Sequence, residues 1–476
     1  RQYGAIDLKA LKKDCESRGY DIGKTYWLTD VKGQKVETNL AGKIINLILV
    51  KFSTLDSEQI GIEMECEKPG WNDAMNGLPG LFSSGLSETV EILRLVNYAK
   101  DHLAPFKDEK IAFLKEQANL FFGLKDDLAG LKTGKLTSFQ YWDKATALRE
   151  ALRLCDKEHA SGEYVEIAIR DILPLLGEFQ GVLTEGLKKA REIGKGIIPS
   201  YLIYDVTSYE KTNHINALGY PTVLATSFKM RNIPPFLEAS ARAMKLGQSV
   251  MSLQDYEAIK ASDLYDHQLH FYKTCASLDD APFEIGRVHA FTKGWLEREC
   301  NFLHMSYKYM LGLLKAGFYP EFYQEIKTNF VVFMDPMVYG RDPAEASSFV
   351  VPTCNPDKKQ WGRGYFARLT GANAEFLNIL TIMFLGEHLY SVEKGKLAFH
   401  LDPKLSKEFF DQNGEASFLL FSKTKITYHN PDLLNCYDGV KLIYVINGKR
   451  YETVEGELAE QIRSGVITAI DVEVSR

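Results

Sequence analysis

The sequence lacks a long apolar run, a basic block and a signal peptide. Its densest apolar stretches, 45–50 and 417–421, fall far short of the roughly 18 residues that a spanning helix needs. The 57 basic residues are outnumbered by 63 acidic ones, giving a formal charge of −6, and form no cluster that would neutralise nucleic-acid phosphates. We therefore expect neither a membrane nor nucleic acid as a partner. Because the chain begins at Arg1 without a leader, we expect a processed chain or a piece of a longer one.

Several cofactor signatures are also missing. The seven cysteines contain no CxxC pair, so we expect neither a zinc site nor a disulfide framework, and a reducing, cytoplasmic location follows most simply. There is no Walker loop and no GxGxxG motif leading from a strand into a helix, so no nucleotide cofactor is indicated. Asp263, His267 and His270 can share one face of a helix, but a solvated polar face explains them equally well, and we predict no metal site.

The distribution of apolar residues divides the chain into a helical part and a β part. Between about residues 86 and 389 apolar side chains recur at i, i+3, i+4 and i+7, which predicts helices at 142–155, 164–191, 235–246, 254–274, 297–316, 320–333 and 372–385. A further helix is expected to begin near Ser87, the candidate N-cap, with Glu88 in its first turn. The stretch 68–85 before it is expected to be a long glycine-rich loop.

After about residue 391 short β-branched runs take over, and Asn447-Gly448 between two of them predicts a tight hairpin. We therefore predict a mainly α protein: a helical toroid, complete or incomplete, followed by a small C-terminal β-sandwich. The predicted divisions are a linker or early barrel segment at 1–60, a catalytic barrel at 61–390 and the sandwich at 391–476.

The densest group of chemically capable side chains lies at 63–82, where aromatic, carboxylate and amide residues alternate on a glycine-rich loop. Such loops often carry function. Trp71 can offer a stacking face to a sugar, with the acid Asp73 two residues away. The competing interpretation is that Asn-Asp and Gly-Leu-Pro-Gly only make turns and that Trp71 belongs to the core.

Residues 70–76, GWNDAMN, resemble the DWNDGMN motif of the inverting disaccharide phosphorylases of glycoside hydrolase family 94. The longer stretch 65–82 is closer still to the β-1,3-glucan phosphorylases of families 149 and 161. The resemblance implies that Asp73 is the general acid and that Trp71 lines the subsite of the transferred glucosyl unit. Gly70 stands where the family 94 motif has its first Asp, and Ala74 where it has Gly.

A second stretch, 295–304, is similar to the ENGG segment and the helix-borne His that follows it in family 94. The resemblance implies that Glu297 contacts the acceptor sugar and that His304 binds phosphate, although Glu299 can also fill the glutamate's place. The seven-residue spacing from Glu297 to His304 equals two helical turns, which would put both on one face. A structural histidine is the competing interpretation for His304.

A third stretch, 362–376, is similar to the Arg-Thr-Gly-Thr-Ala segment that opens the last barrel helix of the family. It implies phosphate binding by Thr370 and Gly371, and a helix start with free N–H groups suits an anion. Thr370 can equally be a plain N-cap, and the two roles are compatible. The turns at 428–431, 439–441 and 447–449 resemble those of the family's C-terminal sandwich.

Taken together, the resemblance implies an inverting phosphorylase with the (α/α)6 six-hairpin glycosidase fold. We expect it to split a terminal β-glucoside, in a β-1,3-gluco-oligosaccharide, into α-glucose 1-phosphate and a shortened chain, reversibly. Inorganic phosphate is the co-substrate, and no metal or other cofactor is expected. The resemblance covers only the C-terminal part of such enzymes, so we expect a homodimer or association with a missing N-terminal portion.

Two other functions stay open from the sequence. An inverting hydrolase of the same fold would need a carboxylate that activates water, for which Glu284 or Glu299 is a candidate. A non-catalytic glucan-binding subunit would keep Trp71 without depending on Asp73. Other polar residues, among them Arg287, His289, Arg341 and Asp342 and the stretch 209–220, receive no assigned role.

Overall fold

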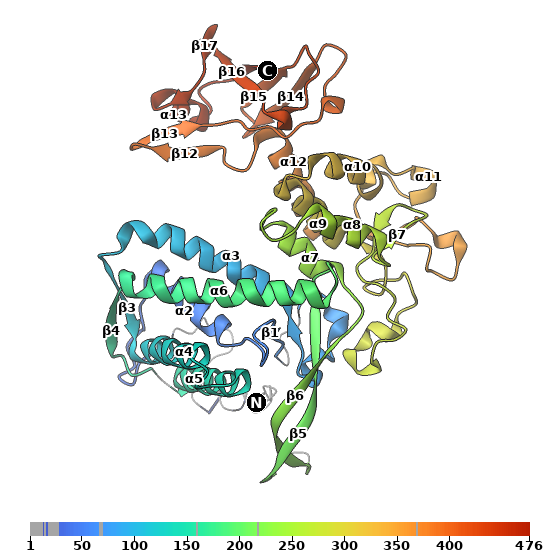
Figure 1. Cartoon of the computed structure of the whole chain (residues 1–476). Coiled ribbons are helices and arrows are strands. Elements are labelled where there is room, and N and C mark those ends of the chain that lie inside the picture. The colour runs from blue at the N-terminus through green and yellow to red at the C-terminus, as the bar shows by residue number, and fades with distance from the viewer. Residues whose placement is uncertain are drawn as a thin grey trace.

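The structure is a computed structural model in which residues 28–65, 70–158, 160–216, 219–367 and 370–476 are described, with Lys13, Glu16 and Ser17, but without the side chains at 156–158, 367 and 370. The described part is rich in helices and contains several small sheets (Figure 1). None of its helices combines the length and the apolar composition needed to cross a membrane. The helices are α2 (Leu40–Phe52), α3 (Leu86–Leu103), α4 (Lys115–Lys132), α5 (Ser138–Glu158), α6 (Ile169–Ile193), α7 (Leu237–Met244), α8 (Leu253–Ala261), α9 (Leu303–Ala316), α10 (Tyr319–Asn329), α11 (Pro336–Tyr339), α12 (Thr370–Leu385) and α13 (Glu457–Ser464).

The first helices form a layered group in which α3 lies along α6 and α4 lies along α5 (Figure 1). Their apolar stripes meet in one core, where Phe52 of α2 and Phe179 of α6 stack with ring centroids 3.6 Å apart. Helix α3 begins at Leu86 with Gly85 as N-cap, so the predicted N-cap Ser87 lies inside the first turn and is buried. The Ser87 prediction was wrong because the chain turns out of β2 (Ser84–Gly85) directly into the helix.

Helix α9 is the central helix of the second half and carries His304 near its start. It packs against α7, α10 and α12 and is buried along most of its length. A Cβ added at Gly312 would lie 2.7 Å from the Cβ of Met244 on α7, so glycine lets the two helices approach closely. The helix ends at Gly317, whose left-handed φ of 78° suits glycine.

Several small sheets are formed by strands that lie between these helices in the sequence. A four-stranded sheet has the order β1 (Ile62–Glu63), β2, β5 (Tyr201–Ile215) and β6 (Pro221–Asn232), and a three-stranded one has the order β11 (Gly364–Ala367), β10 (Ser347–Val350) and β9 (Asn301–Phe302). Two-stranded pairs are β3 (Lys110–Leu114) with β4 (Tyr164–Ala168) and β7 (Tyr265–Asp266) with β8 (Phe271–Tyr272). The β5–β6 hairpin, which the sequence analysis did not predict, projects as a long arm (Figure 1).

Most predicted helices are confirmed, with corrections at their ends. The first residues of 164–191 form strand β4, and the helix expected at 254–274 ends at Ala261. Its second half is instead the β7–β8 hairpin, because the carboxylate of Asp266 accepts the N–H groups of Gln268 and Leu269 and turns the chain. Asp263, His267 and His270 therefore do not share a helix face, and no metal-binding cluster of three or more His, Cys, Asp or Glu residues occurs among the described residues.

The C-terminal part contains two sheets. The larger has the order β14 (Glu415–Leu420), β15 (Thr424–His429), β19 (Ala469–Ser475), β16 (Lys441–Ile446) and β17 (Lys449–Tyr451); the smaller has β12 (Tyr390–Glu393), β13 (Lys396–Phe399) and β18 (Val454–Glu455). The two sheets pack together where the ring of Phe399 in β13 meets the ring of Tyr444 in β16, with the ring centroids 6.0 Å apart. The predicted Asn447-Gly448 hairpin is confirmed, with φ of 51° and 74° and Ile446 paired to Lys449. The predicted domain boundaries and a closed toroid stay predictions.

Candidate active site

The motif loop at 70–77 is shaped by its own side chains. The side chain of Asn72 is buried and accepts the N–H of Ala74, starting a short 3-10 turn over Asp73–Met75. Ala74 and Met75 point into a small hydrophobic core beside Tyr201. Burial of the residues on either side leaves Asp73 itself exposed. The loop is thus held by packing while its acid faces outward.

The same loop lies directly on the segment 284–287. The N–H of Gly77 donates to the carbonyl of Ile285 at 3.0 Å, and a Cβ on Gly77 would lie 1.9 Å from the Glu284 carbonyl oxygen. The side chain of Asn76 accepts the N–H of Arg287 at 3.0 Å. Glycine at position 77 therefore serves close backbone approach, and the contact brings Arg287 to the edge of the motif loop.

Glu297 reaches the motif loop from a distant part of the chain. Its Oε2 accepts the N–H of Ala74 at 2.6 Å. Burial raises the pKa of Glu297, and the charge of Asp73 raises it further, whereas the Ala74 N–H and the charge of Arg287 lower it. Asp73 is therefore close enough for its charge to influence the protonation of Glu297.

The expectation that Glu297 and His304 share a helix face was wrong, because α9 begins only at Leu303. Glu297 lies on a tight turn at 295–299, where Leu296 and Glu299 adopt left-handed φ values of 52° and 58°. Such backbone is costly for residues other than glycine and persists where the surroundings impose it. Here Arg298 anchors the turn by donating to the carbonyls of His289 and Phe291, each at 3.2 Å.

Glu297 and Glu299, the two candidates for contact with the acceptor sugar, lie in different surroundings. Glu299 is 1% exposed, and its carboxylate faces the N–H of Leu278 and the Nε of Arg298 at 3.5 and 3.4 Å. Glu299 therefore stabilises the turn, whereas Glu297 contacts the motif loop. Glu284, the other candidate for a water-activating base, is exposed on a 3-10 turn at Phe283–Ile285.

Trp71 and His304 meet across the loop. The indole Nε1–H of Trp71 donates to Nδ1 of His304 at 3.1 Å. Because an indole can only donate, Nδ1 must accept, and the neutral ring carries its proton on Nε2. Burial and then the charge of Lys308 lower the pKa of His304 to about 4, so the ring is neutral at pH 7. Trp71 is half-buried, and its ring makes a T-shaped contact with the ring of Phe302, with the ring centroids 5.3 Å apart. This contact and the hydrogen bond to His304 hold the indole in place.

The start of α12 also lies against His304. A Cβ on Gly371 would lie 2.6 Å from Nδ1 of His304, so only glycine leaves the ring in place. The helix begins at Thr370, whose side chain lies outside the described residues. The expected contact from the Thr370 hydroxyl therefore stays a prediction.

Two charged residues beside His304 were not predicted from the sequence. Lys308 donates to the carboxylate of Glu375 at 2.7 Å, and Nε2 of His304 lies 3.8 Å from the same Glu375 oxygen. The i, i+4 spacing from His304 to Lys308 on one helix is a signal that would have suggested the first of these.

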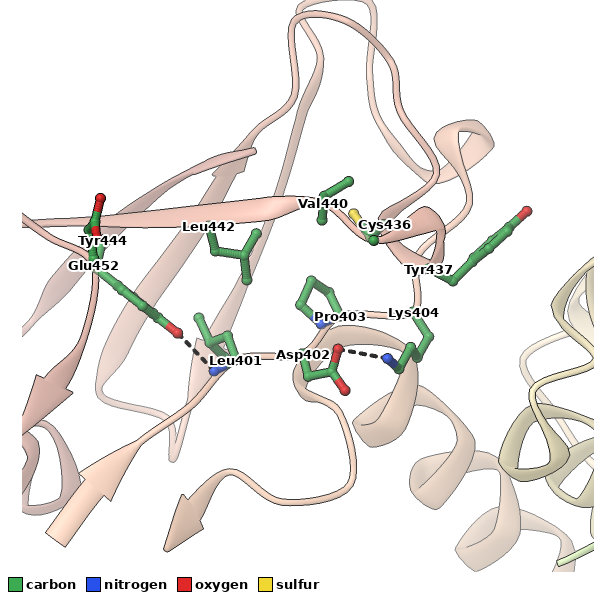
Figure 2. Close-up of a pocket in the computed structure, with 11 residues that line it drawn as sticks. Leu401, Asp402, Pro403, Lys404, Cys436, Tyr437, Val440, Leu442, Tyr444 and Glu452 are labelled. Carbon is green, nitrogen blue, oxygen red and sulfur yellow. Dashed lines mark hydrogen bonds and ion pairs between the residues drawn. The ribbon is translucent and has the colours of Figure 1, made fainter. Parts of the chain in front are cut away.

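A separate pocket of about 320 Å³ lies in the C-terminal part and is shown in Figure 2. Among its charged side chains, Asp402 and Lys404 pair with each other at 2.6 Å and Glu452 pairs with Lys441 at 2.8 Å. The hydroxyl of Tyr444 accepts the N–H of Leu401 at 3.0 Å. These groups are satisfied internally. The pocket contains none of the predicted site residues.

Comparison with known proteins adds little to this geometry. No protein-family model and no curated protein matches the chain. Among solved structures, the crystal structure of a GH63 mannosylglycerate hydrolase from Thermus thermophilus in complex with glucose is similar over 72% of this chain and 95% of that chain. The sequence identity is 9% and the TM-score 0.26, so this likeness decides neither fold nor function.

Proposed function

We propose that this chain cleaves a terminal β-glucoside by inverting phosphorolysis, with a β-1,3-gluco-oligosaccharide as substrate and α-glucose 1-phosphate as product. The supporting observation is that three segments far apart in the sequence meet at one place. The motif loop contacts Glu297 through Ala74 and His304 through Trp71, and the start of α12 lies against His304 at Gly371. The resemblance noted for these three segments involves the same residues.

Each residue has a defined part in the proposed reaction. Asp73 donates its proton to the glycosidic oxygen while a phosphate oxygen forms a bond to the anomeric carbon from the opposite face, and the bond to the leaving sugar breaks. Phosphate is already an anion, so this route needs no base. The neutral His304 offers its Nε2–H to a phosphate oxygen, with the N–H groups at the start of α12 beside it. Glu297 accepts a hydroxyl of the leaving sugar.

Inverting hydrolysis is the second candidate, and the proximity of Asp73 and Glu297 is the observation that favours it. One of two carboxyl groups would then act as the acid and the other would activate water. With its raised pKa, Glu297 would suit the acid, and Asp73 would be the base. Enzymes of this kind release free glucose without phosphate.

One assay separates these reactions. The protein is incubated with β-1,3-gluco-oligosaccharides, and in parallel with cellobiose and sophorose, with and without phosphate. We expect glucose 1-phosphate only with phosphate, and its loss in Asp73→Asn, whereas Asp101→Asn at an exposed position of α3 keeps the activity. Free glucose without phosphate would support the hydrolase, and binding of oligosaccharide with no product would indicate a glucan-binding protein.

A further inference from the structure

Phe283 is the most exposed aromatic side chain among the described residues, with an exposed fraction of 78%. It begins the 3-10 turn at Phe283–Ile285, and its ring stacks on the imidazole of His289, with centroids 5.6 Å apart and planes inclined by 23°. Because a carbonyl oxygen can only accept, Nε2 of His289 donates to the carbonyl of Pro282, at 3.1 Å. A fixed imidazole therefore supports one face of the Phe283 ring, and the other face is open.

The turn that carries Phe283 lies against the motif loop. The N–H of Gly77 donates to the carbonyl of Ile285 at 3.0 Å. A Cβ on Gly286 would lie 2.6 Å from the carbonyl oxygen of Ala74, the residue that follows the acid of the loop. No side chain fits between the two backbones at this point, so the turn is in direct contact with the loop.

Both segments bury their apolar side chains in one small core. From the turn and the motif loop, this core contains Ile285, Val288, Ala74 and Met75. Phe283 and Arg287 of the one segment and Asp73 of the other are exposed. Because the two segments direct their apolar side chains into the same core, their exposed side chains face away from it. Phe283 therefore lies at the rim of the site that Asp73 occupies.

The segment after Phe283 is also bonded to the turn that carries Glu297. Arg298 donates to the carbonyls of His289 and Phe291, each at 3.2 Å, and Glu297 itself accepts an N–H of the motif loop. The stacked pair of Phe283 and His289 is thus connected both to the loop of the acid and to the Glu297 turn. In the proposed reaction Glu297 contacts the leaving sugar, so the pair lies on the side of the leaving chain.

We infer that Phe283 is a stacking platform for a sugar ring of the leaving chain, beyond the sugar that Glu297 contacts. The face of an aromatic ring is negative and attracts the C–H groups on the face of a pyranose ring. The exposed side chains of Glu284 and Arg287 beside it can bind hydroxyl groups of that sugar. This inference rests on the proposed function and adds a preference for chains longer than a disaccharide, since a disaccharide ends at the sugar beside Glu297.

The test compares Phe283→Ala and Phe283→Tyr with Phe106→Ala, a control at an exposed phenylalanine on another 3-10 turn, Ala104–Phe106. KM is measured for the β-1,3-linked disaccharide, trisaccharide and pentasaccharide of glucose, and binding of the pentasaccharide is measured by calorimetry without phosphate. Loss of one stacked ring predicts a KM for the two longer chains, and a pentasaccharide Kd, higher by roughly threefold to twentyfold in Phe283→Ala. The KM values for the disaccharide and for phosphate should not change, and Phe283→Tyr should keep the wild-type values.

The outcomes distinguish this inference from the proposed function. If the wild type performs phosphorolysis and Phe283→Ala has the wild-type KM at every chain length, or loses as much with the disaccharide as with longer chains, the inference is wrong and the function stands. If the wild type binds the pentasaccharide without forming glucose 1-phosphate, the function is wrong, and weaker binding by Phe283→Ala still supports the platform. Absence of any binding overturns both. Thermal melting shows that each variant is folded.

Discussion

Replacing Lys245 with Met is expected to stabilise the fold. Burial lowers the pKa of Lys245 from its ordinary 10.5 to about 8. Each factor of ten in proton affinity corresponds to about 1.4 kcal/mol, so the charged amine costs the folded state about 3 kcal/mol relative to the unfolded chain at pH 7. Met is of similar length and uncharged. Because the amine keeps some contact with water, we expect a gain of about 1 to 3 kcal/mol.

The sign of the pH dependence provides the check. Between about pH 8 and 10.5 the unfolded chain binds the Lys245 proton more tightly than the folded protein does, so this residue makes the wild type more stable as pH rises. Lys245→Met lacks this contribution. Melting temperatures of the two proteins, measured at about pH 7 and about pH 10 without phosphate, should therefore differ more at the lower pH. Lys315→Met provides the control for loss of a lysine that is paired.

If Lys245→Met melts lower than the wild type at neutral pH, or if the difference between them is the same at alkaline pH, the amine is not an uncompensated buried charge and the reasoning fails.

Three further substitutions test the site. Asp73→Asn should lower kcat by about a hundredfold or more, because it removes the proposed proton donor, with the oligosaccharide KM nearly unchanged; equal activity in a phosphorolysis assay would exclude that role. Gly371→Ala should weaken phosphate binding and destabilise the fold by about 1 to 3 kcal/mol, since its methyl group would displace the ring of His304; unchanged calorimetric binding would show that the ring is not needed. Trp71→Phe removes the indole donor and releases the tautomer of His304, so NMR of the imidazole nitrogens should show a mixture of both tautomers.

The sequence predicted the features that depend on short spacing. The Asn447-Gly448 hairpin was predicted because a two-residue hairpin turn needs positive φ at both positions, and Asn and Gly adopt positive φ more readily than other residues. The helix around His304 was also predicted, but its start was placed six residues early, at 297 rather than 303. Apolar periodicity continues through the turn at 295–299, and nothing in Leu296 or Glu299 indicates left-handed backbone, which packing imposes there.

The contacts that build the site could not be predicted in the same way. Trp71 and His304 are 233 residues apart, and Ala74 and Glu297 are 223 apart. Family resemblance brought these segments together, whereas periodicity and spacing give no information about such distances. Lys245 shows the limit most clearly, since its lack of a carboxylate partner among the described residues is a property of the fold alone.

The position of the glutamates bears on the choice between phosphorolysis and hydrolysis. An inverting hydrolase places its acid and base on opposite faces of the sugar ring, about 6.5 to 9.5 Å apart, so that water fits between them. Glu299 cannot act as that base, because it is buried beneath its own turn. The carboxylate of Glu297 accepts the N–H of Ala74, the residue next to Asp73, so Glu297 reaches the motif loop from the turn at 295–299 and lies close to Asp73. In the proposed phosphorolysis Asp73 acts as the single acid, because phosphate needs no second carboxylate to activate it.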